Sequence, residues 1–253
     1  MTSTMSRLAG KTALVTGASG AIGAAVAHGL SAAGVKLLVC GRDRDRLERL
    51  AHETGAAPFI ADLTDLEACR SAVATVERRF GRLDLVYLGV GIGSDCQDLA
   101  EFDPVDYRGV VATNLDTVVF SLAACVPALR RGGGGAIIVL SSLAGVTGYG
   151  RFPLYTMTKA ALNGLVRAAG QRLARCNIHL AAVCPSFVDT PLLGALRDHL
   201  VDKDIPLLTP TEVADAVLQR FCGSPGDEPI WTVQPGHPPA PYAFPDLPPL
   251  APR

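Results

Sequence analysis

The stretch Thr12-Ala13-Leu14-Val15-Thr16-Gly17-Ala18-Ser19-Gly20-Ala21-Ile22-Gly23 decides the fold of this chain. Its apolar start, residues 12–15, predicts a buried strand, and residues 21–33 predict an alanine-rich helix. The glycines between them permit a tight turn, while the helix N-terminus offers unpaired N–H groups and a positive dipole end to a pyrophosphate. A glycine-rich turn alone is weak evidence, because it also suits a plain strand-to-helix connection. Its place between the first strand and the first helix favours a dinucleotide-binding loop.

The alternation of strand and helix continues along the chain. The expected strands are residues 35–40, 58–61, 83–90, 136–140, 179–184 and 230–233, and the expected helices are residues 43–53, 63–80, 106–130, 153–175 and 211–221. The helix at 106–130 is expected to break or bend near its middle. This order predicts an α/β fold: a single doubly wound parallel sheet of Rossmann type, with helices on both faces.

The C-terminal end differs in composition from the rest. Ten of the 18 prolines lie between residues 225 and 252, where a helix is excluded and a strand is disfavoured. The aromatic residues Trp231, Tyr242 and Phe244 favour packing of this segment over disorder. We therefore expect one domain at residues 1–233 and a proline-rich tail at residues 234–253.

Composition excludes several classes of protein. The 253 residues are 49% hydrophobic and 19% charged with a formal net charge of -1, so no global charge favours nucleic acid or an anionic membrane. The N-terminus lacks the apolar stretch of a secretory signal, and polar residues interrupt the apolar runs before they could span a bilayer. The seven cysteines lack zinc-site spacing, which predicts reduced thiols, no metal site and a cytoplasmic location.

The end of the second expected strand bears on cofactor choice. A carboxylate there would bind an adenosine ribose hydroxyl and repel a 2′-phosphate, but the strand ends in Cys40-Gly41-Arg42. Arg42 could pair with that phosphate, which favours NADP(H), with NAD(H) also possible because Asp43 follows at once. The plainer interpretation is that Arg42, Arg44 and Arg46 only begin the next helix and face solvent.

Four polar residues are candidates for chemistry. Tyr155 and Lys159 share a helix face at i, i+4 spacing, and a fixed cation lowers the pKa of a phenol. Ser142 follows a strand at the edge where open α/β sheets bind ligands, although helix capping would also explain a serine there. Asn114 stands in the middle of the helix 106–130, where its side chain competes for backbone hydrogen bonds and favours a local bend.

From about Gly10 to Val233 the chain resembles the short-chain dehydrogenase/reductase family. The residues that carry the resemblance are Thr16-Gly17-Ala18-Ser19-Gly20-Ala21-Ile22-Gly23, Asp62-Leu63, Asn114, Ser142, Tyr155-x-x-x-Lys159 and Pro185-Ser186-Phe187-Val188-Asp189-Thr190-Pro191. Ser142 precedes Tyr155 by 13 residues, the usual spacing in the family. Together these motifs are highly specific.

The resemblance implies a role for each matching residue. Tyr155 would be the acid/base, Lys159 would bind the nicotinamide ribose and lower the pKa of Tyr155, Ser142 would orient the substrate oxygen, and Asn114 would hold a water in a proton relay. The implied cofactor-binding residues are Gly17, Ser19, Gly20, Ala21, Ile22, Gly23, Arg42, Asp62, Leu63, Gly89, Tyr155, Lys159, Pro185, Val188 and Thr190. Among these, Asp62 would contact the adenine, while Val188 and Thr190 would hold the carboxamide. The resemblance makes residues 1–233 a dinucleotide-binding oxidoreductase domain, with a substrate lid expected at about residues 186–208.

Three departures from the family pattern stand out. Ala21 occupies the position of the second turn glycine, and Ser186 replaces a glycine after Pro185. The family's Asn-Asn-Ala-Gly after the fourth strand reads Leu88-Gly89-Val90-Gly91, so the hydrogen bonds of both asparagines are replaced or absent.

The expected activity is hydride transfer between NADPH and a hydrophobic ketone or secondary alcohol. Two alternatives are a C=N or C=C reductase or epimerase on the same fold, and a non-catalytic dinucleotide-binding sensor or scaffold. The expected partners are a small-molecule substrate and further copies of the chain, since the resemblance implies a homodimer or homotetramer built from helices 106–130 and 153–175. Nucleic acid and membrane partners are not expected.

Overall fold

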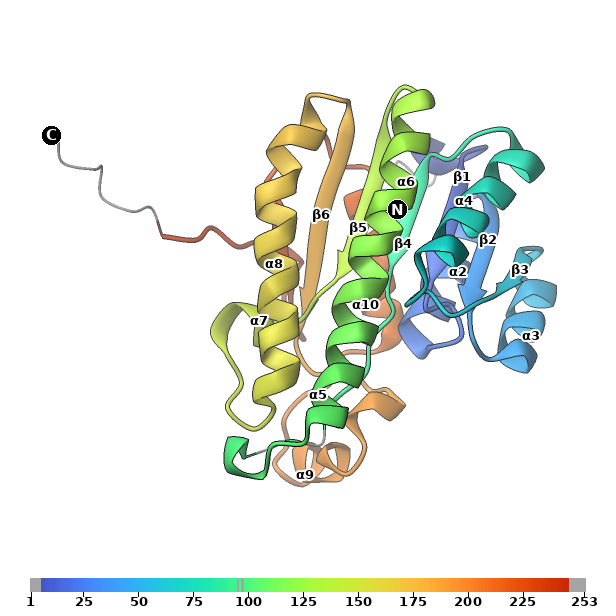
Figure 1. The fold of residues 1–253 in the computed structure, drawn as a ribbon. Helices are drawn as coiled ribbons and strands as arrows, with labels where there is room; N and C mark the ends of the chain where they lie inside the picture. The colour runs from blue at the N-terminus through green and yellow to red at the C-terminus, as the bar shows by residue number, and fades with distance from the viewer. Residues whose placement is uncertain (1–5, 95, 97, 246–253) are drawn as a thin grey trace, which may run out of the picture.

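The computed structural model describes residues 6–94, 96 and 98–245, and within them one sheet organises the molecule (Figure 1). Its strand order is β3-β2-β1-β4-β5-β6-β7-β8. The strands are β1 (Thr12–Thr16), β2 (Lys36–Gly41), β3 (Ala57–Ile60), β4 (Leu85–Leu88), β5 (Gly135–Leu140), β6 (Ile178–Pro185), β7 (Ile230–Val233) and β8 (Ala240–Pro241). All neighbouring pairs are parallel except β7 and β8. The predicted doubly wound parallel sheet is confirmed, with one antiparallel strand added at its edge.

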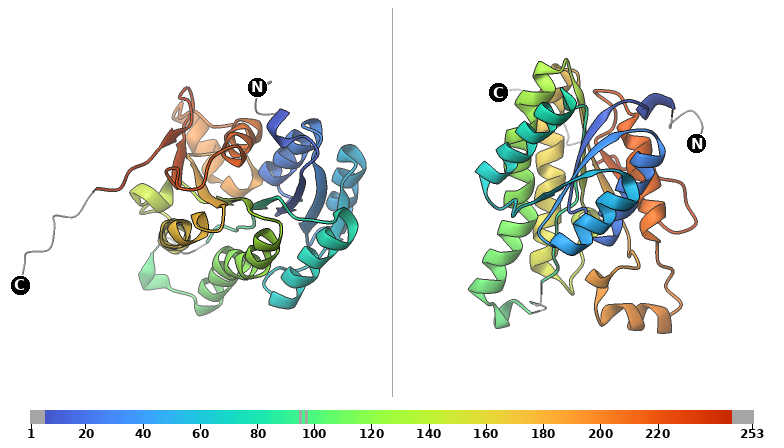
Figure 2. Two further views of the ribbon diagram at one scale, coloured as in Figure 1. Left: turned by 90° about the horizontal axis from the view of Figure 1, so that it is seen from above. Right: turned by 90° about the vertical axis from the view of Figure 1, so that its right-hand side faces the viewer.

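Helices cover both faces of the sheet (Figure 2). The helices α2 (Ala21–Ala32), α3 (Arg44–Thr54) and α10 (Pro210–Phe221) pack on one face, while α4 (Leu66–Phe80), α6 (Thr117–Arg131) and α8 (Pro153–Ala174) pack on the other. Alternate strand residues enter different cores: Val15 lies in the first and Leu14 in the second. Because both side-chain sets are buried, the strands appear in the sequence as unbroken apolar runs.

The long helix at residues 104–131 contains the predicted bend. It consists of α5 (Pro104–Val111), a π-helical segment (Ala112–Asp116) and α6. π-helical turns inside α-helices often occur at functional sites, and this one contains Asn114. By length and composition the stretch Pro104–Arg131 could cross a membrane, but half of its most apolar window is buried inside the molecule. It is therefore a core helix of this fold.

Several short elements were not predicted. They are the 3₁₀ turns η1 (Leu99–Glu101) and η3 (Pro191–Leu193), the helices α7 (Ala144–Thr147) and α9 (Leu196–Asp202), and β8. In the described part of the tail, the Tyr242 N–H donates to the Ile230 carbonyl at 2.8 Å, and the Arg167 guanidinium lies 3.9 Å from the centre of the Phe244 ring. Pro241 has no N–H to donate, which suits its place on an edge strand.

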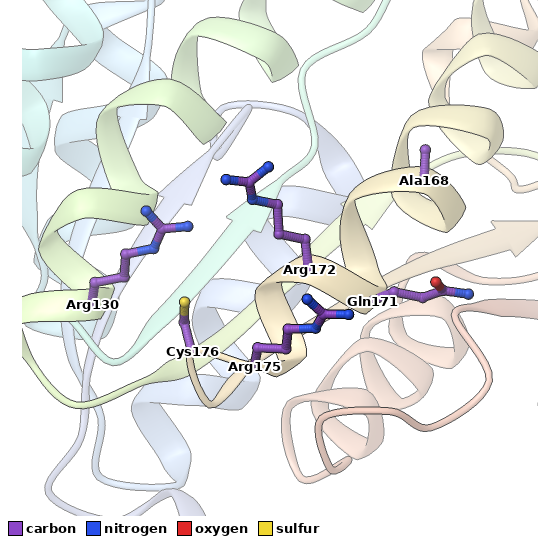
Figure 3. Close-up of a pocket in the computed structure, with 6 residues that line it drawn as sticks. All are labelled: Arg130, Ala168, Gln171, Arg172, Arg175 and Cys176. Atoms are coloured by element: carbon purple, nitrogen blue, oxygen red, sulfur yellow. The ribbon is translucent and has the colours of Figure 1, made fainter.

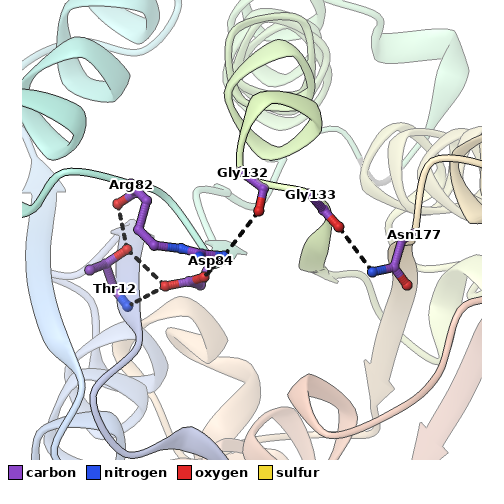
Figure 4. Close-up of polar contacts among 6 residues, drawn as sticks. All are labelled: Thr12, Arg82, Asp84, Gly132, Gly133 and Asn177. Atoms are coloured by element: carbon purple, nitrogen blue, oxygen red, sulfur yellow. Dashed lines mark hydrogen bonds and ion pairs between the residues drawn. The ribbon is translucent and has the colours of Figure 1, made fainter.

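Polar contacts join the segments on the side of the sheet where the parallel strands begin, here called its amino-terminal edge (Figure 4). Asp84, 5% exposed, accepts from the backbone N–H of Thr12 at 3.0 Å and from its hydroxyl at 3.2 Å, and forms an ion pair with Arg82 at 2.6 Å. Arg82 also donates to the Gly132 carbonyl at 3.1 Å. A buried carboxylate with this many partners joins the starts of β1 and β4 to the end of α6.

Candidate active site

The glycine-rich turn lies at the carboxyl end of β1 and is shaped by close backbone contacts. Gly17 has φ +66°, and a Cβ placed on it would lie 2.7 Å from the Gly89 carbonyl carbon. A Cβ on Gly23 would lie 2.3 Å from the Gly17 carbonyl oxygen. Only glycine fits these two positions. The turn therefore brings the start of α2 against the end of β4, at the switch point between β1 and β4.

The N-terminus of α2 is open to a ligand. Its N-cap residue is Gly20, and no side chain caps the helix. The first N–H groups of the twelve-residue helix therefore have no side-chain acceptor, at the switch point where open α/β sheets bind ligands. Ala21 is the first helical residue, followed by Ile22 and Gly23. This arrangement fits the pyrophosphate of a dinucleotide, as the sequence predicts.

Arg42 and Asp62 lie together at the rim beyond β2 and β3. Their side chains approach to 3.8 Å and are 65% and 52% exposed, so this ion pair holds Arg42 only weakly. Asp62 accepts from the Thr64 backbone N–H and hydroxyl, and the backbone bond is the larger cause of its lowered pKa. Asp43 is occupied elsewhere, since it caps α3 by accepting from the Arg46 N–H at 3.0 Å. Arg42 is thus the basic residue that faces this rim.

Ser19 and Leu63 occupy the neighbouring positions. A Cβ on Gly41 would lie 2.9 Å from the Ser19 hydroxyl oxygen, which places Ser19 over the end of β2. Leu63 is buried at 4% exposure in the core beneath α4. The structure therefore brings Ser19 to the crevice and sets the Leu63 side chain below it.

The π-helical segment holds the Asn114 side chain in place. Its Oδ1 accepts from the Ile92 N–H at 2.8 Å, and its Nδ2 donates to the Ile92 carbonyl at 3.0 Å and to the Thr158 hydroxyl at 3.0 Å. Thr158 in turn donates to the Tyr155 carbonyl at 2.8 Å. Asn114 is fully buried and links α8 to the loop after β4. Its side chain therefore fixes the spacing between those two elements.

Lys159 is buried at 3% exposure, and its ammonium points to the carboxyl end of β5. Nζ donates to the Leu140 carbonyl at 2.9 Å and lies 5.6 Å from the centre of the Tyr155 ring. Burial lowers the pKa of Lys159 to about 8, while Cys184 acts in the opposite direction. A lysine with one carbonyl partner in a dry site has donor capacity left for a ligand.

Tyr155 and Ser142 face each other across the site. Ser142 accepts from the Ala144 N–H at 3.1 Å, so the capping interpretation holds for it as well. Burial raises the pKa of Tyr155, and the Ser142 hydroxyl beside the phenol opposes that effect. This direction differs from the lowered pKa expected from Lys159, because here desolvation of the phenol is the largest influence.

Gly91 marks the point at which these groups converge. A Cβ on Gly91 would lie 3.4 Å from Lys159 Nζ and 3.5 Å from Asn114 Oδ1. The segment after β4 therefore passes directly over two of the four predicted catalytic residues. Gly91 retains the final glycine of the family's pattern, and its missing side chain leaves the head groups room.

The departure at Leu88-Gly89 has a steric explanation. Tyr87 on β4 is fully buried, and a Cβ on Gly89 would lie 2.2 Å from its ring. Gly89 thus leaves space for the Tyr87 phenol, whose hydroxyl has no hydrogen-bond partner within the described residues. The Thr16 hydroxyl joins the two strands instead, donating to the Tyr87 carbonyl at 3.1 Å and accepting from the Gly89 N–H at 3.2 Å.

The segment after β6 contains the remaining predicted cofactor-binding residues. Pro185 ends β6, and Val188 forms an isolated parallel bridge with Leu208 that joins the two ends of the predicted lid. Thr190 precedes η3. Within the lid, Arg197 Nε and Nη2 donate to the two oxygens of Asp189 at 2.7 and 3.0 Å. The Ser186 hydroxyl is buried without a partner among the described residues.

Two contributors to this site were not found from the sequence. Thr158 orders Asn114, and Tyr87 fills the space that Gly89 leaves. Thr158 lies between Tyr155 and Lys159, but a threonine inside a helix carries no signal of its own. The pairing of Tyr87 with Gly89 was detectable in principle, since residues i and i+2 point to the same face of a strand.

An α/β sheet with a glycine-lined crevice, an uncapped helix N-terminus and a converging Asn, Ser, Tyr and Lys set defines a dinucleotide-dependent oxidoreductase. A family model described as short chain dehydrogenase matches residues 11–200. The chain therefore belongs to the short-chain dehydrogenase/reductase family, as its motifs predict, and is an enzyme of that type.

Individual relatives agree with this assignment. A tropinone reductase homolog from Arabidopsis thaliana is 33% identical over 204 residues, covering 78% of this chain and 75% of the relative. Cyclohexanol dehydrogenase from Acinetobacter sp. is 31% identical over 215 residues, covering 82% of this chain and 86% of the relative. A crystal structure of 3-ketoacyl-(acyl-carrier-protein) reductase from Brucella melitensis complexed with NADH is 25% identical with a TM-score of 0.83, covering 90% of this chain and 97% of that one.

Proposed function

We propose that this protein uses NADPH to reduce a hydrophobic ketone to a secondary alcohol, and that it also catalyses the reverse reaction. The observation that carries the proposal is the convergence of Lys159 Nζ and Asn114 Oδ1 at Gly91, with the Tyr155 ring 5.6 Å from Nζ. The Ser142 hydroxyl lies beside the Tyr155 phenol. These groups can hold and protonate a carbonyl oxygen.

The chain's residues divide the work of this reaction. When bound, the nicotinamide supplies the hydride that the carbonyl carbon receives. The Tyr155 hydroxyl donates its proton to the carbonyl oxygen, and Ser142 donates a hydrogen bond that orients the same oxygen. Burial raises the pKa of Tyr155, which keeps the phenol protonated near neutral pH, the state required of a proton donor.

Lys159 and Asn114 serve the same oxygen indirectly. Lys159 Nζ lies 5.6 Å from the centre of the Tyr155 ring and would bind the nicotinamide ribose through the donors that Leu140 leaves free. Asn114 is held by Ile92 and Thr158, and would position a water between Lys159 and solvent. A proton leaving Tyr155 could then be replaced along this route.

The preference for NADPH rests on Arg42. Its exposed guanidinium stands at the rim beside Asp62, and Asp43, the carboxylate that would oppose a 2′-phosphate, is turned to the Arg46 N–H. A guanidinium can bind a phosphate through two parallel hydrogen bonds. Asp62 would contact the adenine, and Val188 with Thr190 would hold the carboxamide from the lid side.

The proposed substrate is apolar because the loops after β4, β5 and β6 carry apolar and aromatic side chains. Tyr149 packs edge-on against Phe187 with 5.7 Å between ring centres, and at a tilt against Phe152 with 5.8 Å between ring centres. From the lid, Leu192 reaches the loop after β4 and lies 3.8 Å from a Cβ placed on Gly93. Ring-shaped ketones suit such a pocket, and one similar protein is named for cyclohexanol.

The decisive experiment is a titration of NADPH and NADH, each into wild type, Arg42→Ala and the matched control Arg44→Ala. Arg44 is also exposed, but it is paired with Glu48 on α3. We expect NADPH to bind more tightly than NADH, and Arg42→Ala alone to remove at least about tenfold of that preference. Tighter NADH binding would contradict the choice of cofactor, while no binding of either would contradict the enzyme and favour a sensor or scaffold.

A panel of cyclic and linear ketones, with imines and enones beside them, then tests the reaction. Turnover confined to ketones supports the proposal. Turnover confined to C=N or C=C compounds would show that the fold serves a different reduction.

The assembly and the location are part of the same proposal. The exposed apolar side chains Val119 on α6 and Met157 on α8, 44% and 39% exposed, support a homodimer or homotetramer built from these helices. The cysteines of the described residues are free thiols, which suits the proposed cytoplasmic location. Sedimentation of wild type and Val119→Asp tests the assembly. A monomeric wild type would contradict it.

A further inference from the structure

The segment between β6 and α10 is closed at its base by backbone hydrogen bonds. The Asp189 N–H donates to the Leu208 carbonyl, and the Leu208 N–H donates to the Phe187 carbonyl, both at 2.8 Å. Val188 pairs with Leu208 as a parallel bridge between these contacts. Residues 190–207 therefore form a loop whose two ends are fixed. Its helix α9 lies beyond the carboxyl ends of the strands, on the side of the candidate active site (Figure 1).

Within this loop the chain reverses its direction at Gly194. This residue follows η3 with φ +50° and ψ −134°, a conformation that glycine adopts readily and other residues do not. The Arg197 N–H then donates to the Gly194 carbonyl at 3.2 Å. Because of this turn, Arg197, the second residue of α9, lies back beside Asp189 at the start of the loop.

The side chains of Asp189 and Arg197 close the turn. Arg197 Nε and Nη2 donate to the two carboxylate oxygens at 2.7 and 3.0 Å. Both side chains are nearly half exposed, and most exposed ion pairs contribute little. This pair is bidentate, however, and joins residues only eight positions apart, so little chain entropy is lost in forming it. Hydrogen bonds from Arg197 also lower the pKa of Asp189, which keeps the carboxylate charged at neutral pH.

The segment between the two charged residues contains η3 and two groups that bear on the site. Thr190 is the N-cap residue of η3, but its hydroxyl makes no capping bond, which leaves it for the carboxamide that it is proposed to hold. Leu192, within η3, lies 3.8 Å from a Cβ placed on Gly93 in the loop after β4. The position of η3 therefore sets both the Thr190 hydroxyl and the Leu192 contact across the crevice.

We propose that Asp189 and Arg197 are a positioning pair, which holds η3 so that Thr190 can bind the nicotinamide carboxamide. Neither side chain touches the cofactor, and both act through the segment between them. This inference rests on the proposed binding of a nicotinamide cofactor, but not on the choice of NADPH over NADH. Breaking the pair should weaken binding of the nicotinamide half of the cofactor and leave binding of the adenosine half unchanged.

Calorimetric titration of two ligands separates the halves. NADPH and adenosine 2′,5′-bisphosphate, which keeps the 2′-phosphate but lacks the nicotinamide, are each titrated into wild type, Asp189→Asn, Arg197→Gln and the double variant. We expect every variant to bind NADPH about threefold to tenfold more weakly and to bind the bisphosphate as wild type does. The double variant should bind NADPH no more weakly than either single variant, because all three lose the same interaction. NADH and AMP take the place of these ligands if wild type binds NADH more tightly.

The matched control is the double variant Glu77→Gln/Arg131→Gln. Arg131 Nη2 donates to both oxygens of Glu77 at 2.8 and 3.0 Å, so this is also an exposed arginine bound to two carboxylate oxygens. It lies at the opposite edge of the sheet, where the preceding residue, Arg130, lines a hollow between the C-terminal ends of α6 and α8 (Figure 3). The control should bind both ligands as wild type does.

Hydrogen exchange followed by mass spectrometry examines the same segment without any ligand. In Asp189→Asn the backbone N–H groups of residues 190–205 should exchange at least about threefold faster than in wild type or in the control, because the turn at Gly194 is no longer held. The N–H groups of α10, beyond the base of the loop, should exchange at the wild-type rate.

Three results would overturn the inference and leave the proposed function standing. They are equal NADPH binding in wild type and the Asp189 and Arg197 variants, an equal loss of binding for both ligands, and unchanged hydrogen exchange of residues 190–205 in Asp189→Asn. Additive losses of NADPH affinity in the double variant would also overturn it, since the two residues would then act separately. If neither NADPH nor NADH bound to wild type, the proposed function would be contradicted, and this inference with it.

Discussion

The amino-terminal edge of the sheet, where the parallel strands begin, and the carboxyl edge, where they end, differ in how their buried charged groups are paired. At the amino-terminal edge Asp84 has hydrogen bonds from Thr12 and an ion pair with Arg82, so its charge is compensated. At the carboxyl edge Lys159 is equally buried but has one carbonyl partner, and its pKa is lowered to about 8, chiefly by burial. Compensated groups stabilise the fold, whereas uncompensated groups keep donors available for a ligand.

The largest expected effect is that of Tyr155→Phe on turnover. Removing the proton donor should lower the rate by about a hundredfold to ten-thousandfold, because general acid catalysis commonly contributes that much. The free energy of unfolding should stay the same or rise. Tyr242→Phe, which removes a phenol hydroxyl from the tail, is the matched control. Retained turnover in Tyr155→Phe would place the proton donor elsewhere.

The next effect concerns Lys159 and pH. Its folded pKa of about 8 lies below the ordinary 10.5, so below pH 8 the folded protein carries a poorly solvated charge that the unfolded chain solvates well. The free energy of unfolding of Lys159→Met should therefore exceed that of wild type by up to about 3 kcal/mol below pH 8. This difference should shrink between pH 8 and 10.5.

Urea unfolding at several pH values measures this difference. The exposed Lys203→Met is the control and should show no such change. If the free energy of unfolding had the same pH dependence in wild type and Lys159→Met, the Lys159 charge would not be poorly solvated in the folded protein.

Asp84→Asn tests the opposite edge, with a smaller effect. The variant keeps the size of the side chain but removes the charge that Arg82 and Thr12 compensate. We expect a loss of about 1–3 kcal/mol in the free energy of unfolding, which lowers Tm by about 2–4 °C per kcal/mol in a chain of this size. Turnover per folded molecule should not change, because no catalytic residue touches Asp84. A loss of turnover would contradict the claim that Asp84 stabilises the fold without affecting catalysis at the other edge.

Tyr87→Phe should have the smallest effect, in the stabilising direction. Its hydroxyl is buried without a partner among the described residues, so removing it should leave stability equal or raise it by about 1 kcal/mol. Gly89→Asn should destabilise wild type, since its Cβ meets the Tyr87 ring, and should be tolerated in a Tyr87→Val background. Additive effects of these two substitutions on thermal unfolding would contradict the steric explanation.

Much of the fold follows from the sequence because its strands are buried on both faces. Continuous apolar runs identified β1 to β7, and Asn114 inside a helix indicated the bend that proved to be a π-helical segment. The elements η1, α7, η3 and α9 are three to seven residues long, too short for periodicity to show. The strand β8 was missed because a proline-rich segment resembles a loop until a partner strand is known.

For the site, the sequence predicted which residues meet but not how their surroundings tune them. Spacing identified Ser142, Tyr155 and Lys159. The raised pKa of Tyr155 depends on how much of the phenol is desolvated, and the role of Thr158 depends on the approach of Asn114 from another helix. Both are consequences of packing between distant segments, which local pattern does not encode.

The most direct test of this account measures turnover and the free energy of unfolding together, in Tyr155→Phe and Asp84→Asn, with NADPH and the best ketone of the panel. The account predicts that Tyr155→Phe loses turnover and keeps its stability, while Asp84→Asn loses stability and keeps its turnover per folded molecule. If either substitution lowered both quantities to a similar extent, the two edges would not have separate roles.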